Sequence, residues 1–298
     1  MIKRTLFFSN PAYLSTRQQQ LVVNFPEEEK PPATVPIEDL GMIVLEHPQI
    51  TLTNGLLTQL VQNKTAVVNC DARHLPVSLL QPLTGHTEQT ERIRHQLNAS
   101  LPLKKNLWQQ TVSAKILNQA GHLHKTGKNA KKLFRWAGEV KSGDTDNHEA
   151  IAAAHYFQNL FDIEGFSRNQ KGIPPNNLLN YGYAILRAVT ARAIIGSGLL
   201  PTVGIFHRNK YNAYCLADDM MEPYRIYVDV LVKELTDTGT EYAELTLPLK
   251  TELLKLPAMD VVLEGKRSPL MVAMSRTTNS LYECFAGLSR KLIYPVYD

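Results

Sequence analysis

The chain has 298 residues, of which 44% are hydrophobic and 20% charged, and its formal net charge is +4. These values are typical of a globular protein with one large domain or two. They argue against a membrane protein, because no stretch supplies the ~18 uninterrupted apolar residues of a membrane-spanning helix. The nearest stretch, 188–206, is interrupted by Arg192, Gly196, Gly198 and Pro201.

Cysteine usage and the first residues bear on the cellular compartment. Cys70, Cys215 and Cys284 are far apart and form no CxxC pair, which argues against a zinc cluster or a disulfide framework. Met1-Ile2-Lys3-Arg4 leads into a short apolar run without a small-residue cleavage site, so we expect no signal peptide. We therefore expect a cytoplasmic protein that makes no contact with a membrane.

The first part of the chain is predicted to be rich in β-structure. Thr53 is the expected N-cap of a short helix over 54–62, whose leucines share one face. Three acids and two prolines in the segment 27–32 predict a solvent-exposed turn. The predicted strands are 3–8, 21–25, 34–37, 42–46 and 66–69. The pattern predicts a β-rich domain over 1–84, which ends near Gln81-Pro82-Leu83-Thr84-Gly85.

From about Thr87 the hydrophobic period becomes helical, and glycine and proline become sparse. The predicted helices are 87–98, 102–125, 129–141, 146–162, 176–197, 215–236 and 269–288. In the second of them, Trp108, Val112, Ile116, Ala120 and Leu123 form an apolar stripe. The expected fold class is α+β, with the β-rich domain followed by a larger all-α domain over 85–298.

Positive charge is concentrated in one segment of the predicted helical domain. Residues 91–135 hold ten basic side chains and a single acid, a balance of +9 that leaves −5 for the rest of the chain. Such a local excess indicates a polyanion partner, although solvent-exposed lysines on helix faces are the alternative. The DNA-binding residues expected in this segment are Lys125, Lys128, Lys131, Lys132 and Arg135.

The stretch 204–230 carries the most distinctive chemistry. His207 follows an apolar run, and Asp218, Asp219 and Glu222 follow at spacings of three and four that share a helical face. An imidazole with carboxylates can bind a divalent cation. Three alternatives stay open: acids that stabilise the start of a helix, a histidine buried in the core, and a solvent-exposed acidic face. Glu149 is a further ligand candidate, although its spacing from Asp146 also fits a capping box.

Several motifs occur in the order found in a known family. LLNYGYAILRA at 178–188 precedes GLLPTVGIFHRNKYNAYCLADDMMEPYRIYVD at 198–229, and the chain opens with IKRTLFFSNPAYLSTRQQQLVV. This arrangement resembles the CRISPR adaptation integrases, the Cas-one proteins, over most of the chain. The wording LADDMMEPYR is similar to the type II branch. The resemblance also implies the β-rich and helical domains predicted above.

The resemblance implies which residues are catalytic. The family holds its metal with a Glu on an early helix, a His, and an acid that follows a D-x-x-acid pattern. The matching positions are Glu149, His207 and Glu222, with Asp219 as the preceding acid. The last ligand departs from the Asp of some branches, and a longer glutamate can still coordinate. The implied cofactor is Mg²⁺, with Mn²⁺ as a substitute.

The implied activity is integration of short prespacer DNA into the CRISPR array by 3′-OH transesterification, with endonuclease activity when water attacks. The implied partners are double-stranded DNA (prespacer and CRISPR repeat), a second copy in a homodimer, a Cas-two dimer that bridges two such dimers, and the type II effector nuclease. Two other functions stay open: a general metal-dependent DNA nuclease or junction-cleaving repair enzyme, and a non-enzymatic DNA-binding helical protein.

Two further expectations concern the ends of the chain. The family uses residues of its amino-terminal domain to separate prespacer ends, and Tyr13 is an aromatic suited to that role. The tail Leu292–Tyr297 is apolar and aromatic, so it is either a docking strip for Cas-two or a segment that folds back on its own chain.

Overall fold

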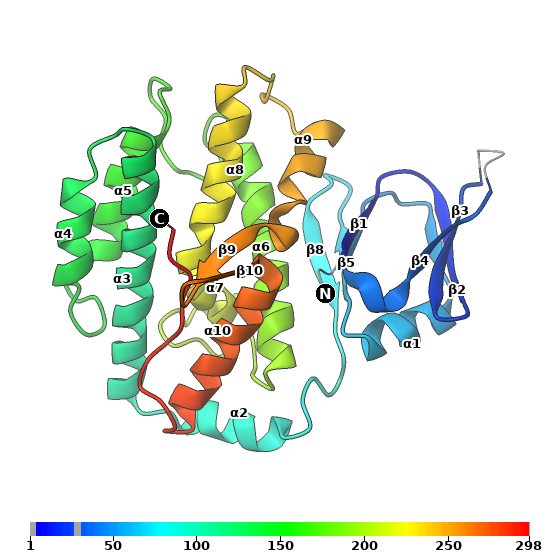
Figure 1. Cartoon of the computed structure of the whole chain (residues 1–298), viewed down its shortest axis with the longest axis horizontal. Coiled ribbons are helices and arrows are strands. Elements are labelled where there is room, and N and C mark those ends of the chain that lie inside the picture. The colour runs from blue at the N-terminus through cyan, green and yellow to red at the C-terminus, as the bar shows by residue number, and fades with distance from the viewer. Residues whose placement is uncertain (1–3, 27–30, 298) are drawn as a thin grey trace. The chain divides into compact units, whose positions relative to one another are not determined.

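The structure is a computed structural model that describes residues 4–26 and 31–297. The chain divides into two compact units, residues 1–85 and 86–298, so the division falls one residue after the expected boundary. The first unit is β-rich and the second is mainly helical, which confirms the expected α+β class (Figure 1). Lys3 and most of the predicted turn at 27–32 lie outside the described residues.

The first unit contains two four-stranded sheets. One has the order β1-β5-β7-β8, in which β1 (Arg4–Phe8), β5 (Leu40–Leu45) and β7 (Ala66–Cys70) are parallel and β8 (Pro76–Leu80) is antiparallel to β7. The other has the order β4-β3-β2-β6, made of β4 (Ala33–Pro36), β3 (Gln20–Asn24), β2 (Ala12–Arg17) and β6 (Ile50–Leu52). Every residue of β5 is buried, as expected of an apolar run in a central parallel strand.

The helix of this unit and three of its strands test the sequence prediction. Helix α1 (Asn54–Gln62) begins as predicted, with the Thr53 side chain accepting a hydrogen bond from the Leu56 N–H. Strands β2, β6 and β8 were not predicted, because each is defined by its pairing with neighbouring strands and not by an apolar run of its own. Tyr13 lies in β2 with 53% of its surface exposed, so its ring is available for contact and not packed in the core.

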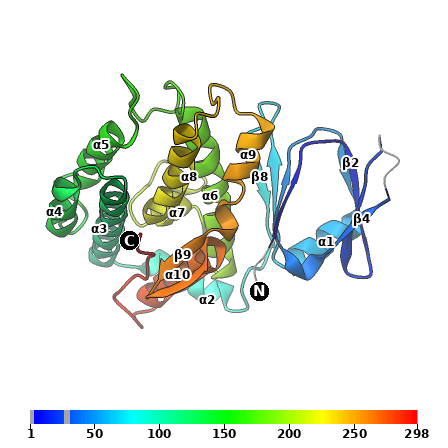
Figure 2. The ribbon, with the colours of Figure 1, turned by 45° about the horizontal axis from the view of Figure 1, so that its top comes forward.

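The second unit is built around two helices. Helix α3 (Leu101–Lys125) lies beside α4 (Lys131–Glu139), α5 (His148–Leu160) and the short turn η2 (Glu222–Tyr224) (Figures 1 and 2). Helix α6 (Asn176–Gly196) is buried on most sides by its neighbours. Those neighbours are α7 (Cys215–Met221), α8 (Arg225–Asp237), α9 (Leu247–Leu253), η3 (Leu256–Ala258) and α10 (Leu270–Phe285). Helix α2 (Gln89–Asn98) packs on α10.

Two expectations about this unit were wrong. It is not entirely helical, because β9 (Asp260–Leu263) and β10 (Lys266–Pro269) form an antiparallel hairpin. The single helix predicted over 215–236 is instead α7, η2 and α8 in succession. Pro223 explains the interruption, since it has no N–H to donate and its ring disfavours a continuous α-helix. The interruption places Glu222 at the first position of the η2 turn.

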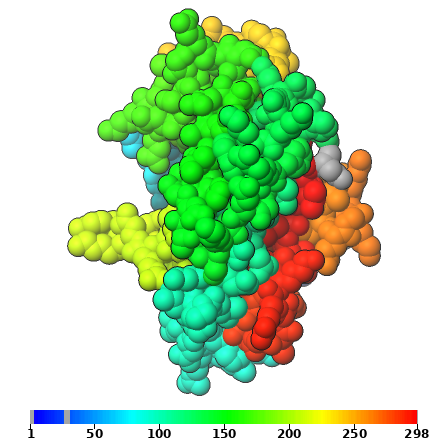
Figure 3. All heavy atoms as spheres, turned by 90° about the vertical axis from the view of Figure 1, so that its left-hand side faces the viewer, coloured from blue at the N-terminus to red at the C-terminus, as the bar shows by residue number. Residues whose placement is uncertain are grey.

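The carboxyl-terminal tail folds back on its own chain beside α3 (Figure 3, red). Asn118 of α3 accepts a hydrogen bond from the Tyr297 N–H and donates to the Pro295 and Pro223 carbonyls, at 3.0, 3.1 and 2.8 Å. Gly121 is needed here, since a Cβ at that position would collide with the Tyr297 carbonyl. The tail is thus internal packing that Asn118 links to η2, which favours the fold-back alternative over a free docking strip.

Candidate metal centre

Glu149 lies in the first turn of α5, and the local backbone sets its position. Asp144 caps this helix: its two carboxylate oxygens accept hydrogen bonds from the His148 and Glu149 N–H groups, both at 2.9 Å. Asn147 turns the chain into the helix with a left-handed φ of 56°. Asp146 instead pairs with Lys141 at 2.8 Å. The capping box suggested by the Asp146–Glu149 spacing is therefore wrong, and the Glu149 side chain is not used in a cap.

The Glu149 carboxylate and the Glu222 carboxylate meet at one ammonium group. Lys115 projects from α3, is only 6% exposed, and places its Nζ 2.5 Å from Glu149 Oε1 and 2.6 Å from Glu222 Oε2. Burial favours the neutral amine, but the two carboxylates outweigh it and raise the pKa of Lys115. Two acids that are 73 positions apart in the sequence thus share a single buried cation.

Glu222 is the more buried of the two acids. Its Oε1 accepts a hydrogen bond from Arg225 Nε at 2.9 Å, whereas its Oε2 contacts Lys115 without hydrogen-bond geometry and has no other partner among the described residues. Burial by itself raises the pKa of Glu222, but the charges of Arg225 and Lys115 reverse the effect and lower it to about 2. This carboxylate is therefore ionised across the physiological range.

His207 is held in place by Asp219. The Nδ1 atom of His207 lies 2.6 Å from Asp219 Oδ1, and since an ionised carboxylate only accepts, Nδ1 donates and leaves Nε2 free to bind a ligand. Asp219 also accepts from the backbone N–H groups of Ile205, Phe206 and His207, at 2.7, 3.0 and 3.1 Å. Gly204 lets the backbone of 205–207 fold closely around this carboxylate, because a Cβ at Gly204 would lie 2.5 Å from the His207 carbonyl oxygen.

Electrostatics and packing further define the histidine. The hydrogen bond to Asp219 raises the pKa of His207, and burial raises the pKa of Asp219. The buried ring of Trp108, on α3, stacks on Phe206 with centroids 4.2 Å apart and meets the His207 ring edge-on at 5.7 Å. The histidine is therefore half-exposed and oriented, and the expectation that it could be a core residue does not hold.

The structure brings together two of the three predicted metal ligands directly. Within residues 4–26 and 31–297, no three His, Cys, Asp or Glu side chains are placed to hold a metal ion together. Glu149 and Glu222 converge on Lys115, while His207, on the loop before α7, is held by Asp219 of α7. The assignment of all three as metal ligands stays a prediction, and the position that a cation would take between the two acids holds an ammonium group.

Asp218 serves a different purpose from Asp219. It is buried, it accepts a hydrogen bond from Arg187 Nε at 2.7 Å, and it accepts another from Asn212 Nδ2 at 2.7 Å. The alternative of a solvent-exposed acidic face at 218–219 is therefore wrong. Asp218 fastens the loop that follows His207 onto α6, and this loop projects from the helical unit (Figure 3, yellow-green).

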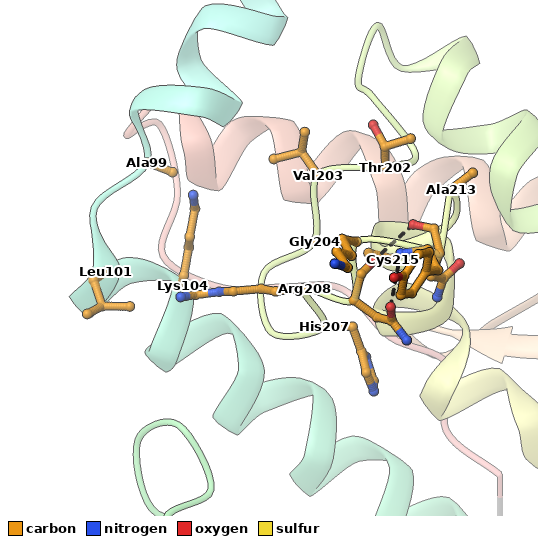
Figure 4. A pocket seen from close by; sticks show the side chains of 14 residues that line it. Ala99, Leu101, Lys104, Thr202, Val203, Gly204, His207, Arg208, Ala213 and Cys215 are labelled. Carbon is orange, nitrogen blue, oxygen red and sulfur yellow. Dashed lines mark hydrogen bonds between the residues drawn. The ribbon is translucent and has the colours of Figure 1, made fainter.

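The projecting loop borders a pocket beside His207. The pocket has a volume of about 850 Å³, and its lining includes Lys104, His207, Arg208, Lys210 and Tyr211. Arg208 extends from the loop toward the start of α3, where Lys104 lies (Figure 4). Tyr211 is 85% exposed. Cationic side chains and an exposed ring next to the histidine are suited to phosphate groups and stacked bases.

The basic segment 91–135 does not present its charge uniformly. Lys115 is ion-paired with the carboxylates of Glu149 and Glu222, and Lys128 pairs with Asp162 at 2.5 Å. Arg135 lies 3.6 Å from Glu139, and Lys125 lies 4.8 Å from the centre of the Tyr297 ring. Lys131 and Lys132 are exposed at the start of α4. The surface available for a polyanion is therefore narrower than the count of +9 suggests.

Sequence reasoning missed three residues of this centre. Lys115 was counted only as one charge of the basic segment, although it lies seven positions after Trp108 and so falls on the apolar stripe of α3, where a lysine needs a partner. Arg225 follows Glu222 by three positions, and this spacing could have predicted the ion pair between them. Asp144 carried no signal, because its capping role depends on the left-handed turn at Asn147.

Comparison with known proteins identifies the family. The family described as CRISPR associated protein Cas1 matches residues 6–243. The chain belongs to the Cas1 family. It is 39% identical to a CRISPR-associated endonuclease Cas1 of Neisseria meningitidis serogroup C, over 98% of this chain and 94% of that protein. The family resemblance stated from the motifs is thus confirmed.

Solved structures support the same fold. A casposase bound to its integration product matches with a TM-score of 0.74 and 19% identity, over 98% of this chain and 92% of that one. The Cas1-containing chain of a Cas6-RT-Cas1–Cas2 complex matches with a TM-score of 0.70 and 18% identity, over 97% of this chain and 36% of that one. At these identities the likeness concerns the fold of this Cas1 chain.

No helix among the described residues has the length and apolar character to span a membrane.

Proposed function

We propose that this Cas1 protein is a metal-dependent DNA integrase that inserts short prespacer DNA into the CRISPR array by 3′-OH transesterification, and that it cleaves DNA when water replaces the hydroxyl. The observation that carries the proposal is the convergence of Glu149 and Glu222 on one buried cation, beside a histidine oriented by Asp219. The type II branch rests on the wording LADDMMEPYR.

The donor set fits a divalent metal ion. Glu222 Oε2 is buried without a hydrogen bond, Glu149 is not used in a cap, and His207 keeps Nε2 free. Carboxylate oxygens suit Mg²⁺, and the imidazole makes Mn²⁺ a good substitute. When bound by these residues, the ion would polarise the scissile phosphate and lower the pKa of the attacking hydroxyl.

The residues of the chain itself supply positioning. Asp219 keeps the His207 ring in one tautomer and one orientation, and Trp108 limits its rotation. Arg225 holds Glu222 from one side and lies over the Tyr183 ring at 4.6 Å, so the carboxylate cannot swing toward solvent without losing this ion pair. Such support keeps the reacting groups in place before the DNA arrives.

DNA is bound by cationic surfaces in this proposal. Lys104, Arg208 and Lys210 border the pocket beside His207, where they would contact the phosphates of the strand that reacts. Lys131 and Lys132 offer a second surface on α4. Tyr13 is exposed in the first unit, in keeping with contact to a prespacer end. Lys125, Lys128 and Arg135 have ring or carboxylate neighbours and are expected to contribute less.

Assembly is the remaining part of the proposal. The similar fold in a complex that contains Cas2 supports Cas2 as a partner. The arrangement in which a Cas2 dimer bridges two Cas1 homodimers is the one that the family resemblance implies. The type II effector nuclease is a further proposed partner. Co-purification of tagged Cas2 with this chain, followed by a mass measurement of the complex, tests the stoichiometry of four Cas1 chains to two Cas2 chains.

The decisive experiment is strand transfer of a labelled short duplex into a supercoiled plasmid that bears the repeat, with Mg²⁺ and again with Mn²⁺. Glu149→Ala, His207→Ala and Glu222→Ala should each abolish joining while DNA binding persists, because the DNA is held mainly by lysine and arginine. Near-wild-type joining by either Glu149→Ala or His207→Ala would refute the site. Nicking without joining would favour a general nuclease, and binding indifferent to Mg²⁺ and to all three variants would favour a non-enzymatic DNA-binding protein.

A further inference from the structure

Lys115 occupies an unusual position for a lysine in a helix interior. It is 6% exposed on α3, and its Nζ lies within 2.6 Å of carboxylates from two other elements, Glu149 of α5 and Glu222 of η2. A buried ion pair is costly to form and is a weak source of stability, so its presence calls for another reason. The other carboxylate oxygen of Glu222 is already paired with Arg225. The centre therefore has two carboxylates and two cations before any metal ion is added.

Charge balance makes the ammonium and a divalent ion competitors. With both carboxylates neutralised by Lys115 and Arg225, a divalent ion bound by the same oxygens would leave an excess of two positive charges in a largely buried site. Like charges a few ångströms apart repel strongly where water is scarce. One cation therefore has to leave when the ion binds.

The two cations differ in their freedom to move. The Arg225 guanidinium lies against the Tyr183 ring at 4.6 Å, and its Nε donates to Glu222 at 2.9 Å. The contacts of Lys115 are made by a single ammonium at the end of a flexible four-carbon chain. Both of its contacts are to the carboxylates that the ion would bind. The lysine is thus the cation that can be displaced.

We propose that Lys115 is a built-in cation that holds the Glu149 and Glu222 carboxylates together and is displaced when a divalent metal ion binds them. This inference rests on the metal site of the proposed function. It makes Lys115 a positioning residue: it preserves the geometry of the ligand pair without metal and lowers the affinity of that pair for metal.

The test is Mn²⁺ binding to the full chain by calorimetry, without DNA. Lys115→Met should bind Mn²⁺ at least about tenfold more tightly than wild type, because one buried positive charge beside the ion is gone. Its melting temperature without metal should be lower, and the deficit should shrink at saturating Mn²⁺. Lys128→Met is the matched control, since Lys128 also contacts a carboxylate at 2.5 Å but with an exposed partner, and its Mn²⁺ affinity should equal that of wild type.

Lys115→Gln is the second variant, for use if the methionine does not fold, because an amide can still donate to the carboxylates. Affinity that is unchanged or weaker in the folded variant would overturn the proposal, as would the absence of Mn²⁺ binding in every chain tested. The proposed function is judged separately, by strand transfer of wild type in Mg²⁺. Tighter Mn²⁺ binding in a variant that no longer joins DNA would therefore support the displacement of Lys115 by the metal ion. It would not bear on the integrase function, which strand transfer by the wild type tests.

Discussion

Removing the Asp219 carboxylate tests how the histidine is held. Asp219 is 0% exposed and accepts four hydrogen bonds, from the N–H groups of Ile205, Phe206 and His207 and from His207 Nδ1. Asp219→Ala leaves all four donors without this acceptor. The loop around them then loses its anchor to α7, and the imidazole loses both its preferred tautomer and its orientation.

The expected magnitude follows from the burial of each bond. A hydrogen bond to a charged group contributes about 1.5–3 kcal/mol, and the Ile205 N–H is buried where water cannot replace the lost partner. The other three donors are partly exposed, so water can replace the carboxylate as their hydrogen-bond acceptor. We therefore expect a loss of about 3 kcal/mol in the free energy of unfolding, which corresponds to roughly 6–12 °C in melting temperature for a unit of this size. Strand transfer should fall by about 10–100-fold.

The assay is thermal melting beside strand transfer for Asp219→Ala, Glu149→Ala and a control. Glu252→Ala is the control, because its carboxylate contacts Lys255 at 2.5 Å on the surface and an exposed ion pair is worth about 0–1 kcal/mol. A wild-type melting temperature together with full activity would refute the anchoring role of Asp219. Activity as completely lost as in Glu149→Ala, with an unchanged melting temperature, would instead make Asp219 a ligand.

The remaining predictions concern pH and salt. Burial, assisted by nearby lysines, lowers the pKa of His122 from 6.5 to about 4, so between these values the unfolded chain takes up a proton that the folded chain refuses. The stability that the folded chain gains by keeping His122 neutral is therefore fully present above pH 6.5, and it is lost as the pH falls toward 4. Urea unfolding at pH 7.5 and pH 5 should show wild type losing about 2 kcal/mol relative to His122→Gln, and equal pH dependence would contradict it. Replacing both Lys131 and Lys132 with Ala should flatten the salt dependence of DNA binding by about 2 in log–log slope. Lys128→Ala, whose ammonium is already paired, should change the slope less, and the control Lys255→Ala should leave it unchanged; an unaltered slope in the double variant would exclude this surface.

Local pattern predicted many of the elements of the fold. The period of 3.6 residues located α3 and α6 closely, and the Thr53 cap located the start of α1. Strand β2 escaped prediction because its identity depends on pairing with β3 and β6, which no local pattern records. The helix predicted over 215–236 failed at Pro223, where the absence of one N–H outweighed the apolar period.

The sequence by itself determined the family, the α+β class and the identity of the acids and the histidine, because motifs in order and hydrophobic periods are written locally along the chain. Only the tertiary structure decided what those residues contact. Packing α3 against α5 and η2 buried Lys115 between two acids that are distant in sequence, and folding the 204–214 loop over α7 placed His207 on Asp219. The physical reason is that a buried charge takes its partner from whichever element packs against it, and that choice is made in three dimensions.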